Sequence, residues 1–132
     1  MVLRLRKFLD ELLDVLREDY PKQLSRLIKD ANGLTYLQVL DKERAVITVR
    51  NRKIAIASKA RKDEINVRVY ISKSCLFDVL EGKLTLAEAF ETGELRVFGS
   101  PQTLLRCYAI WERVISLART SPRFYFLTYE LR

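Results

Sequence analysis

Hydrophobic residues recur every three or four positions at the start of the chain. They form one stripe of an amphipathic helix that we predict over residues 2–18, with the members Leu5, Phe8, Leu9, Leu12, Leu13 and Leu16. Pro21 suits the first position of a second helix, and the pair Asn32-Gly33 provides a left-handed stop for it. The pattern therefore predicts an N-terminal helical hairpin over residues 1–33.

The hydrophobic period changes to two from residue 34 onward. Segments rich in Val and Ile alternate with short polar turns, which predicts four strands at residues 34–40, 45–50, 53–57 and 65–72. Antiparallel hairpins are the simplest connection between strands at this spacing.

Helical periodicity returns after the fourth predicted strand. Ser72 or Ser74 can cap a short helix that Gly82 ends. Thr85 and Glu88 form a capping box, in which each side chain satisfies the free backbone amide of the other residue at the start of another short helix. Two short helices are therefore expected here.

The last predicted helix is apolar over an unusually wide face. It follows a fifth strand at residues 94–99, begins at Ser100-Pro101 and extends to about residue 118. Apolar residues cover roughly half of its circumference, namely Leu104, Cys107, Tyr108, Ile110, Trp111, Val114, Ile115, Leu117 and Ala118. Such a helix either lies between two layers of core or forms a wall of an internal pocket.

Composition restricts the chemistry available to the chain. Its 132 residues fit one domain, and a content of 48% hydrophobic and 31% charged residues can form a packed core. There is no histidine, which excludes Ser-His-Asp and Cys-His catalysis and imidazole metal sites. The two cysteines form no CxxC pair and the four glycines form no phosphate-binding motif. We therefore expect no metal and no cofactor.

The expected location of the protein is the cytoplasm. No apolar run approaches the ~20 residues that a membrane span requires. The basic start of the chain is followed at once by Asp10, Glu11 and Asp14, in place of the apolar segment of a signal peptide.

One cysteine is a candidate nucleophile. Cys75 lies near a predicted helix start and beside Lys73, where a thiolate would be stabilised. Because the chain offers no histidine and no other organised base, we expect Cys75 to be a small, partly buried residue and the protein not to be an enzyme.

The net charge of +7 is concentrated in residues 42–73, which contain ten basic and three acidic residues. Six bases without an acid lie close together there: Arg50, Arg52, Lys53, Lys59, Arg61 and Lys62. One interpretation is a solvated hairpin whose bases protect a sheet edge. The other is a docking patch for an anionic surface, which would be either a lipid headgroup layer or an acidic protein. No aromatic residue lies between Leu37 and Val69, which argues against nucleic acid as a partner.

A run at residues 74–100, SCLFDVLEGKLTLAEAFETGELRVFGS, resembles the motif of the sterol carrier protein type-2 (SCP2) family. The resemblance rests on a helix with two leucines, three glycines and an apolar anchor between them, namely Leu76, Leu80, Gly82, Lys83, Leu84, Ala89, Phe90, Gly93, Glu94, Leu95, Arg96, Val97 and Gly99. Of the glycines, Gly82 and Gly93 would end helices, and Gly99 would let the fifth strand turn into the last helix.

The resemblance implies an α/β (α+β) fold, with a five-stranded, mostly antiparallel sheet covered on one face by helices. It also implies an apolar tunnel that holds fatty acids, acyl chains, sterols or isoprenoids. Carried over to this chain, the tunnel would be lined by Leu76, Phe77, Leu80, Leu84, Phe90 and Val97 and closed by Leu104, Tyr108 and Trp111.

The end of the chain departs from the family pattern. Residues 124–131 alternate so that both sides are apolar, which indicates an additional strand, a pocket plug or the contact of a homodimer. We therefore expect one domain over residues 1–132, made of the helical hairpin, a body at residues 34–118 and an apolar tail at residues 119–132.

Two functions are compatible with these features. The first is non-catalytic binding and transfer of apolar lipids in an internal tunnel, with transient contact to an anionic membrane. The alternative is a protein–protein interaction module with a filled core, which docks through the basic residues 42–73 or through the tail at residues 124–131.

Overall fold

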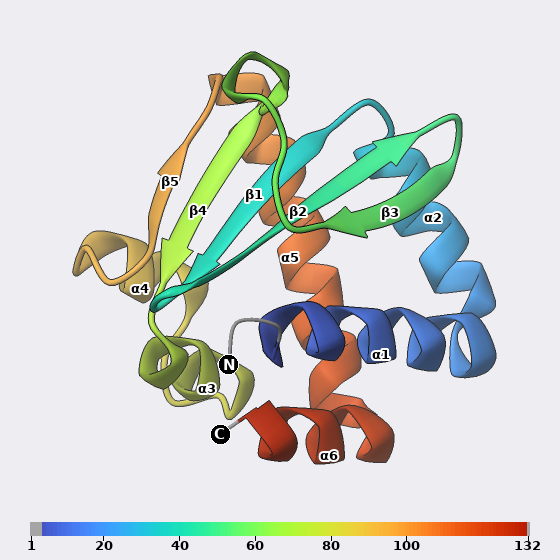
Figure 1. Ribbon diagram of the computed structural model, residues 1–132. Helices are drawn as coiled ribbons and strands as arrows, with labels where there is room; N and C mark the ends of the chain where they lie inside the picture. Colours follow the sequence, from blue (N-terminus) through green and yellow to red (C-terminus); the bar gives the residue numbers. More distant parts are fainter. Residues whose placement is uncertain (1–3, 132) are drawn as a thin grey trace.

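A computed structural model describes residues 4–131 of the chain, and five strands of this part form one mixed sheet in the order β3-β2-β1-β4-β5 (Figure 1). The strands are β1 (Thr35–Leu40), β2 (Glu43–Arg50), β3 (Lys53–Ala57), β4 (Val67–Ile71) and β5 (Arg96–Phe98). Three strand pairs are antiparallel, and β1 pairs with β4 in parallel, with Leu37 opposite Arg68. The fold class expected from the sequence is confirmed.

The predicted hairpins are right for β1, β2 and β3 and wrong for the step to β4. Residues 58–66, which include a short turn of 3₁₀ helix at Lys62–Glu64, carry the chain across the sheet to the far side of β1 (Figure 1). The reason is burial: Val67, Val69 and Ile71 are buried, so β4 takes a central place, whereas no residue of β3 is fully buried and β3 forms an edge.

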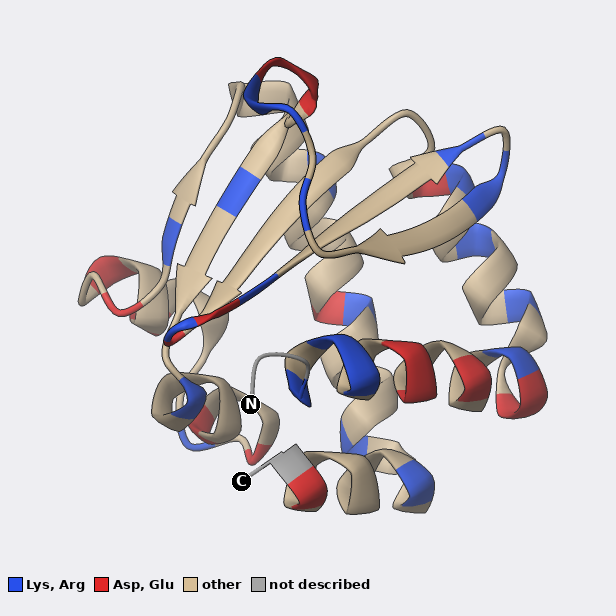
Figure 2. Cartoon of the chain, viewed as in Figure 1, with Lys and Arg blue, Asp and Glu red and all other residues tan. Residues whose placement is uncertain are grey.

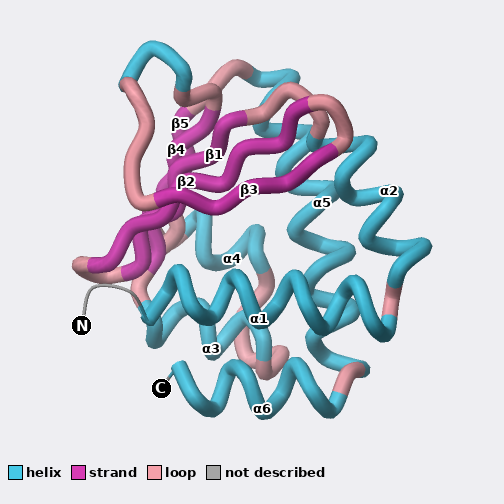
Figure 3. Tube along the Cα trace, turned by 45° about the vertical axis from the view of Figure 1, so that its right-hand side comes forward, coloured by secondary structure: helices cyan, strands magenta, loops and turns pink. Residues whose placement is uncertain are grey.

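Six helices of the described chain lie on one side of the sheet (Figures 1 and 3). They are α1 (Arg4–Asp19), α2 (Pro21–Ala31), α3 (Lys73–Leu80), α4 (Leu86–Glu91), α5 (Pro101–Thr120) and α6 (Pro122–Leu131). Strand residues alternate between this side and the other, where the Arg96 guanidinium lies 5.2 Å from the centre of the Tyr70 ring.

The predicted caps are confirmed. The Ser72 hydroxyl accepts a hydrogen bond from the Cys75 N–H, and Thr85 and Glu88 form the expected capping box at α4. Gly99 lies between β5 and α5, where a turn was expected, and its φ is not positive. A Cβ at this position would lie 3.1 Å from the Asn66 carbonyl oxygen, so glycine permits the close approach of the chain to the start of β4.

The tail is helical, so the expectation of an additional strand is wrong. Ser121 and Pro122 begin α6, and the Phe124 N–H donates a hydrogen bond to the Ser121 hydroxyl at 3.3 Å. Phe124 is buried and Leu127 half-buried, which is a helical spacing of three. The inner face of α6 therefore packs onto the body of the protein, and the apolar residues on its outer face make the segment look like a two-sided strand.

The first and last helices lie against each other (Figures 1 and 3). An Arg4 nitrogen donates to the Glu130 carbonyl oxygen at 2.9 Å, and the Arg123 guanidinium lies 3.0 Å from the Glu18 carboxylate and 3.1 Å from that of Asp19. α1 begins at Arg4, and its predicted start at residue 2 lies outside the described residues. Within residues 4–131, no helix has both the length and the apolar character needed to cross a membrane.

Candidate functional site

An apolar cavity of about 280 Å³ lies between the sheet and the helices. Its wall combines α1, α2, α3, α5 and α6 with the inward side chains of β1 to β4, together with Leu86 and Leu95. An engineered apolar cavity of about 150 Å³ already takes up benzene, and ordinary ligand pockets begin near 300 Å³. The cavity is therefore large enough for part of an apolar ligand.

The wall of the cavity is almost entirely hydrocarbon. Two polar side chains on β1 face it, and the Tyr36 hydroxyl donates to the Gln38 amide oxygen at 2.7 Å. The Tyr36 ring also meets the Trp111 ring edge to face, with centroids 5.9 Å apart. Burial raises the pKa of Tyr36 well above its usual 10.0, so the hydroxyl remains a neutral donor. Among the described residues, no charged side chain lines the cavity.

The structure brings together three of the nine residues expected in the tunnel. Leu76 and Leu80 of α3 and Trp111 of α5 line the cavity. Four others are half-buried and pack against the neighbouring core: Phe77, Leu84, Val97 and Leu104.

The remaining two expected tunnel residues lie on the surface. Phe90 is 55% exposed, because α4 turns Leu86 and Ala89 inward and leaves Phe90 on its outer side. Tyr108 is 45% exposed, because it lies at the edge of the wide apolar face of α5, whose inner side carries Cys107 and Trp111. Neither residue lines the cavity.

Much of the wall comes from segments that we did not assign to the site from the sequence. These are the stripe of α1 and the inner face of α2, with the members Leu9, Leu12, Leu13, Leu16, Leu24, Leu27 and Ile28. The tail, for which a pocket plug was one of three alternatives, contributes Phe124 to the wall. The signal that could have found them is the amphipathic stripe of each N-terminal helix, which must cover an apolar surface of the body.

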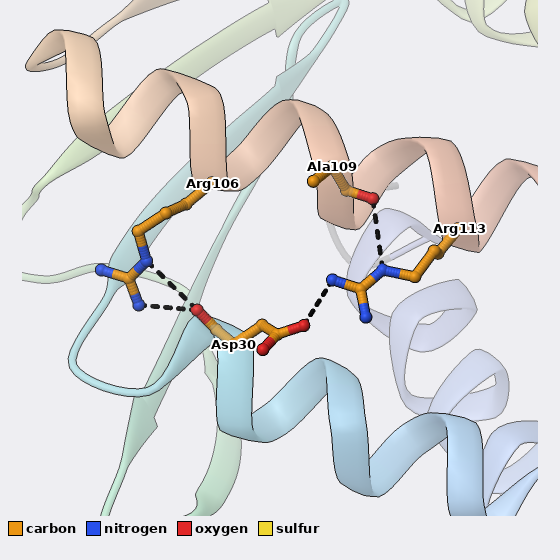
Figure 4. A network of polar contacts seen from close by, with 4 residues as sticks. All are labelled: Asp30, Arg106, Ala109 and Arg113. Atoms are coloured by element: carbon orange, nitrogen blue, oxygen red, sulfur yellow. Dashed lines mark hydrogen bonds and ion pairs between the residues drawn. The ribbon is translucent and has the colours of Figure 1, made fainter.

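A polar network fastens α2 to α5 beside the cavity (Figure 4). The Arg106 guanidinium donates to the Asp30 carbonyl oxygen at 2.6 and 3.2 Å and to the Asn32 carbonyl oxygen at 3.1 Å. The Arg113 guanidinium forms an ion pair with the Asp30 carboxylate and donates to the Ala109 carbonyl oxygen at 3.4 Å. The network satisfies the free carbonyls at the end of α2 and holds this helix in the cavity wall.

Cys75 lacks the properties of a nucleophile. Its side chain is 2% exposed, and burial, with the nearby Glu94 carboxylate, raises the pKa of the thiol from 9.0 to about 11. The thiol is therefore protonated near neutral pH, which agrees with the structural role expected from the sequence.

The six clustered bases fall into two groups, one around the turn between β2 and β3 and one on the loop between β3 and β4 (Figure 2). Arg50, Arg52 and Lys53 surround the turn between β2 and β3, and the Arg50 guanidinium donates to the Thr35 hydroxyl at 3.0 Å. Lys59, Arg61 and Lys62 lie between β3 and β4, where Arg61 is paired with Asp63 and Glu64 at 3.5 and 2.9 Å. The turn between β2 and β3 is thus the more strongly basic of the two places.

Comparisons with known proteins agree with this architecture. The family model described as the SCP-2 sterol transfer family matches residues 11–111 of the chain. The comparison with curated proteins gave no match.

The solved structures with a similar fold include the following three. The sterol carrier protein domain 2 of Helicoverpa armigera has a TM-score of 0.64 and 18% identity, over 86% of this chain and 89% of that one. Sterol carrier protein 2 of Yarrowia lipolytica in its apo form has a TM-score of 0.60 and 24% identity, over 85% of this chain and 89% of that one. The sec-alkyl sulfatase PisA1 has a TM-score of 0.51 and 22% identity over 63% of this chain, which spans only 14% of the sulfatase.

Proposed function

Because the chain belongs to the SCP-2 sterol transfer family, we propose that it binds apolar lipids in the cavity between the sheet and the helices and transfers them. The observation that carries the proposal is the wall of the cavity, which is hydrocarbon apart from Tyr36, Gln38, the thiol of Cys107 and the indole of Trp111. Acyl chains, sterols and isoprenoids are the matching ligand classes.

The transfer free energy of hydrocarbon drives binding in this proposal. Each buried methylene contributes ~0.8 kcal/mol, so a sixteen-carbon chain that is fully buried gains on the order of 12 kcal/mol before the costs of ordering it. No covalent step is needed, and the protonated thiol of Cys75 supplies no nucleophile. The protein acts as a carrier, and the basic turn between β2 and β3 holds it near an anionic membrane during exchange.

An interaction module is the second candidate, and one observation favours it. Three aromatic side chains on the outer face of α6, Tyr125, Phe126 and Tyr129, are between 62% and 67% exposed. Exposed aromatic side chains of this kind often mark a contact with another protein. The cavity favours the carrier, since an interaction module needs no open space in its core.

The proposal is tested by displacement of a neutral, environment-sensitive probe from the purified protein, with native mass spectrometry of protein from its own host. We expect micromolar binding of the probe and displacement by long-chain lipids. Leu80→Arg should abolish binding, because it places a charge in the cavity wall. Leu105→Arg is the matched control, since Leu105 is 74% exposed on α5.

A milder variant separates loss of binding from loss of folding. Trp111→Phe should retain the fold and change probe affinity, because the indole lines the cavity without being fully buried. If the folded wild-type protein binds no apolar ligand, the carrier function is wrong.

A further inference from the structure

A second cavity, of about 290 Å³, adjoins the apolar one. It runs along α2 and is lined by Arg17, Pro21, Leu24, Ser25, Ile28, Lys29 and Arg52, which we call the basic groove. Leu24 and Ile28 line both cavities. Leu24 and Ile28 of α2 therefore form part of the wall between the basic groove and the apolar cavity.

The basic groove carries positive charge that its surroundings do not neutralise. Arg17 lies 3.3 Å from the Asp14 carboxylate, but neither Lys29 nor Arg52 has an ion-pair partner within residues 4–131. The acid nearest to Lys29 along the chain, Asp30, is held by Arg113 on α5 (Figure 4). The end of the groove beside the turn between β2 and β3 thus presents an ammonium and a guanidinium group.

Arg52 occupies a position where the backbone geometry favours glycine. Asn51 and Arg52 form the two-residue turn of the hairpin, with φ of 53° and 61°. The Arg52 N–H donates to the Asn32 amide oxygen at 3.0 Å, and the Asn32 carbonyl oxygen accepts from Arg106 at 3.1 Å. These contacts hold the turn against the end of α2. They place the cationic side chain of Arg52 beside the groove, although the positive φ of this residue favours glycine.

We propose that the basic groove binds the anionic head of the ligand, a phosphate or carboxylate, while the hydrocarbon part of the same molecule lies in the apolar cavity. This inference rests on the proposed function and narrows the cargo to an anionic amphiphile. A charged head cannot enter the cavity without a large penalty, since no described charged side chain lines it. The guanidinium of Arg52, the ammonium of Lys29 and the hydroxyl of Ser25 are donors suited to such an oxyanion.

The test compares three ligands with the same chain and different heads: dodecyl phosphate, dodecanoate and dodecanol. Affinities are measured at pH 8 by displacement of the neutral probe, below the critical micelle concentration and without vesicles. We expect dodecyl phosphate to bind roughly tenfold more tightly than dodecanol, with dodecanoate between them. This advantage should shrink as salt rises from 0.05 to 0.5 M, because salt screens exposed charges.

Variants of the basic groove distinguish the contribution of the ligand's anionic head from that of its hydrocarbon part. Lys29→Gln combined with Arg52→Gln should weaken dodecyl phosphate binding about fivefold and leave dodecanol binding unchanged. Arg52→Gly should weaken phosphate binding without lowering the melting temperature, because glycine suits the turn. The control, Lys59→Gln combined with Lys62→Gln, removes the same charge from the loop between β3 and β4 and should change neither affinity.

The outcomes distinguish this inference from the proposed function. If dodecanol binds and dodecyl phosphate binds no more tightly, the inference is wrong and the carrier function stands. The inference is also wrong if the groove variant and its control lose the same affinity for dodecyl phosphate, or if neither loses any. The second result is the one expected if the bases act only on whole membranes. If none of the three ligands binds, the carrier function itself is wrong.

Discussion

Tyr36 and Gln38 share a hydrogen bond and line the cavity, so substitutions of these residues should affect both stability and ligand binding. Tyr36→Phe removes the donor to the Gln38 amide oxygen and should lower the free energy of unfolding by about 1 kcal/mol. Gln38→Leu removes the other partner of the bond. A double-mutant cycle measured by chemical denaturation should show that the double variant loses less than the sum of the single losses.

Additive losses in this double-mutant cycle would contradict the prediction. If the free energies of unfolding lost by the two single variants add up to the loss of the double variant, the hydrogen bond contributes nothing beyond the separate burial of the two side chains. The same variants should bind dodecanol with changed affinity, because both side chains line the cavity.

Cys75 gives the protein a stability that depends on pH. The thiol ionises near pH 9.0 when unfolded, whereas its folded pKa is about 11. The unfolded state therefore releases the proton first, so this contribution is complete below pH 9 and is lost as pH rises toward 11. The free energy of unfolding should fall by about 2 kcal/mol between pH 8 and pH 10.5 from this group alone.

Cys75→Ala isolates the effect. Burial also raises the pKa values of Cys107 and Tyr36, so the variant should keep part of the alkaline loss and lose the part due to Cys75. Urea denaturation at both pH values measures the difference, and equal alkaline losses in the variant and the wild type would contradict the assignment.

At the scale of elements, α6 has two faces of different importance. Phe124 is 2% exposed and lines the cavity, whereas Phe126 is 66% exposed on the opposite side. Phe124→Ala should therefore lower the free energy of unfolding by about 3 kcal/mol, and Phe126→Ala by less than about 0.5 kcal/mol. Thermal unfolding of the two variants provides the comparison, and similar losses would mean that α6 does not pack as described.

The same pair of variants tests the proposed homodimer. If the outer face of α6 joins two copies of the chain, Phe126→Ala should lower the mass measured in solution by sedimentation. A monomeric wild-type protein would exclude this contact and, with it, one form of the interaction module.

Local signals predicted most of the elements. The capping box at Thr85 and the serine caps at Ser72 and Ser100 depend only on neighbours along the chain. The same Ser-Pro signal that begins α5 also begins α6 at Ser121-Pro122, and we missed it because apolar residues on both faces of α6 imitate strand alternation. The parallel pair of β1 and β4 could not be predicted, since strand order depends on which strands the core buries.

The site was harder to predict than the elements, because an apolar cavity and a filled core use the same residue types. The cavity is lined by Leu76, Leu80 and Trp111. Phe77 and Leu104 are apolar residues of the same helices, yet they pack against the core outside the cavity. Which side chain faces open space is decided by how α1, α2 and α6 lie over the sheet. That arrangement is tertiary, and no local pattern of the sequence encodes it.

For the whole molecule, the uneven charge predicts which part of the surface an anionic membrane would contact. The turn at residues 50–53 has three bases and no acid, whereas residues 59–64 have three bases and two acids. Arg52→Glu with Lys53→Glu should weaken binding to phosphatidylserine vesicles roughly tenfold at low salt, and the effect should nearly vanish at 1 M salt. Arg50 is kept, because it donates to the buried Thr35 hydroxyl.

A matched reversal on the other loop is the control for this measurement. Lys59→Glu with Lys62→Glu should weaken vesicle binding less, because Arg61 there is already paired with acids. Cosedimentation with anionic and neutral vesicles decides the matter. A wild-type protein without preference for anionic vesicles would show that these bases serve only as a solvated edge.

The cavity wall joins the first helix of the chain to its last, since α1 and Phe124 of α6 both line it. During synthesis, α1 leaves the ribosome more than a hundred residues before Phe124 does. Until Phe124 has left the ribosome, the cavity lacks part of its wall and the stripe of α1 keeps part of its apolar surface uncovered. A chain that lacks α6 therefore lacks a complete cavity wall, and under the proposed carrier function lipid is loaded only after this helix has joined the fold.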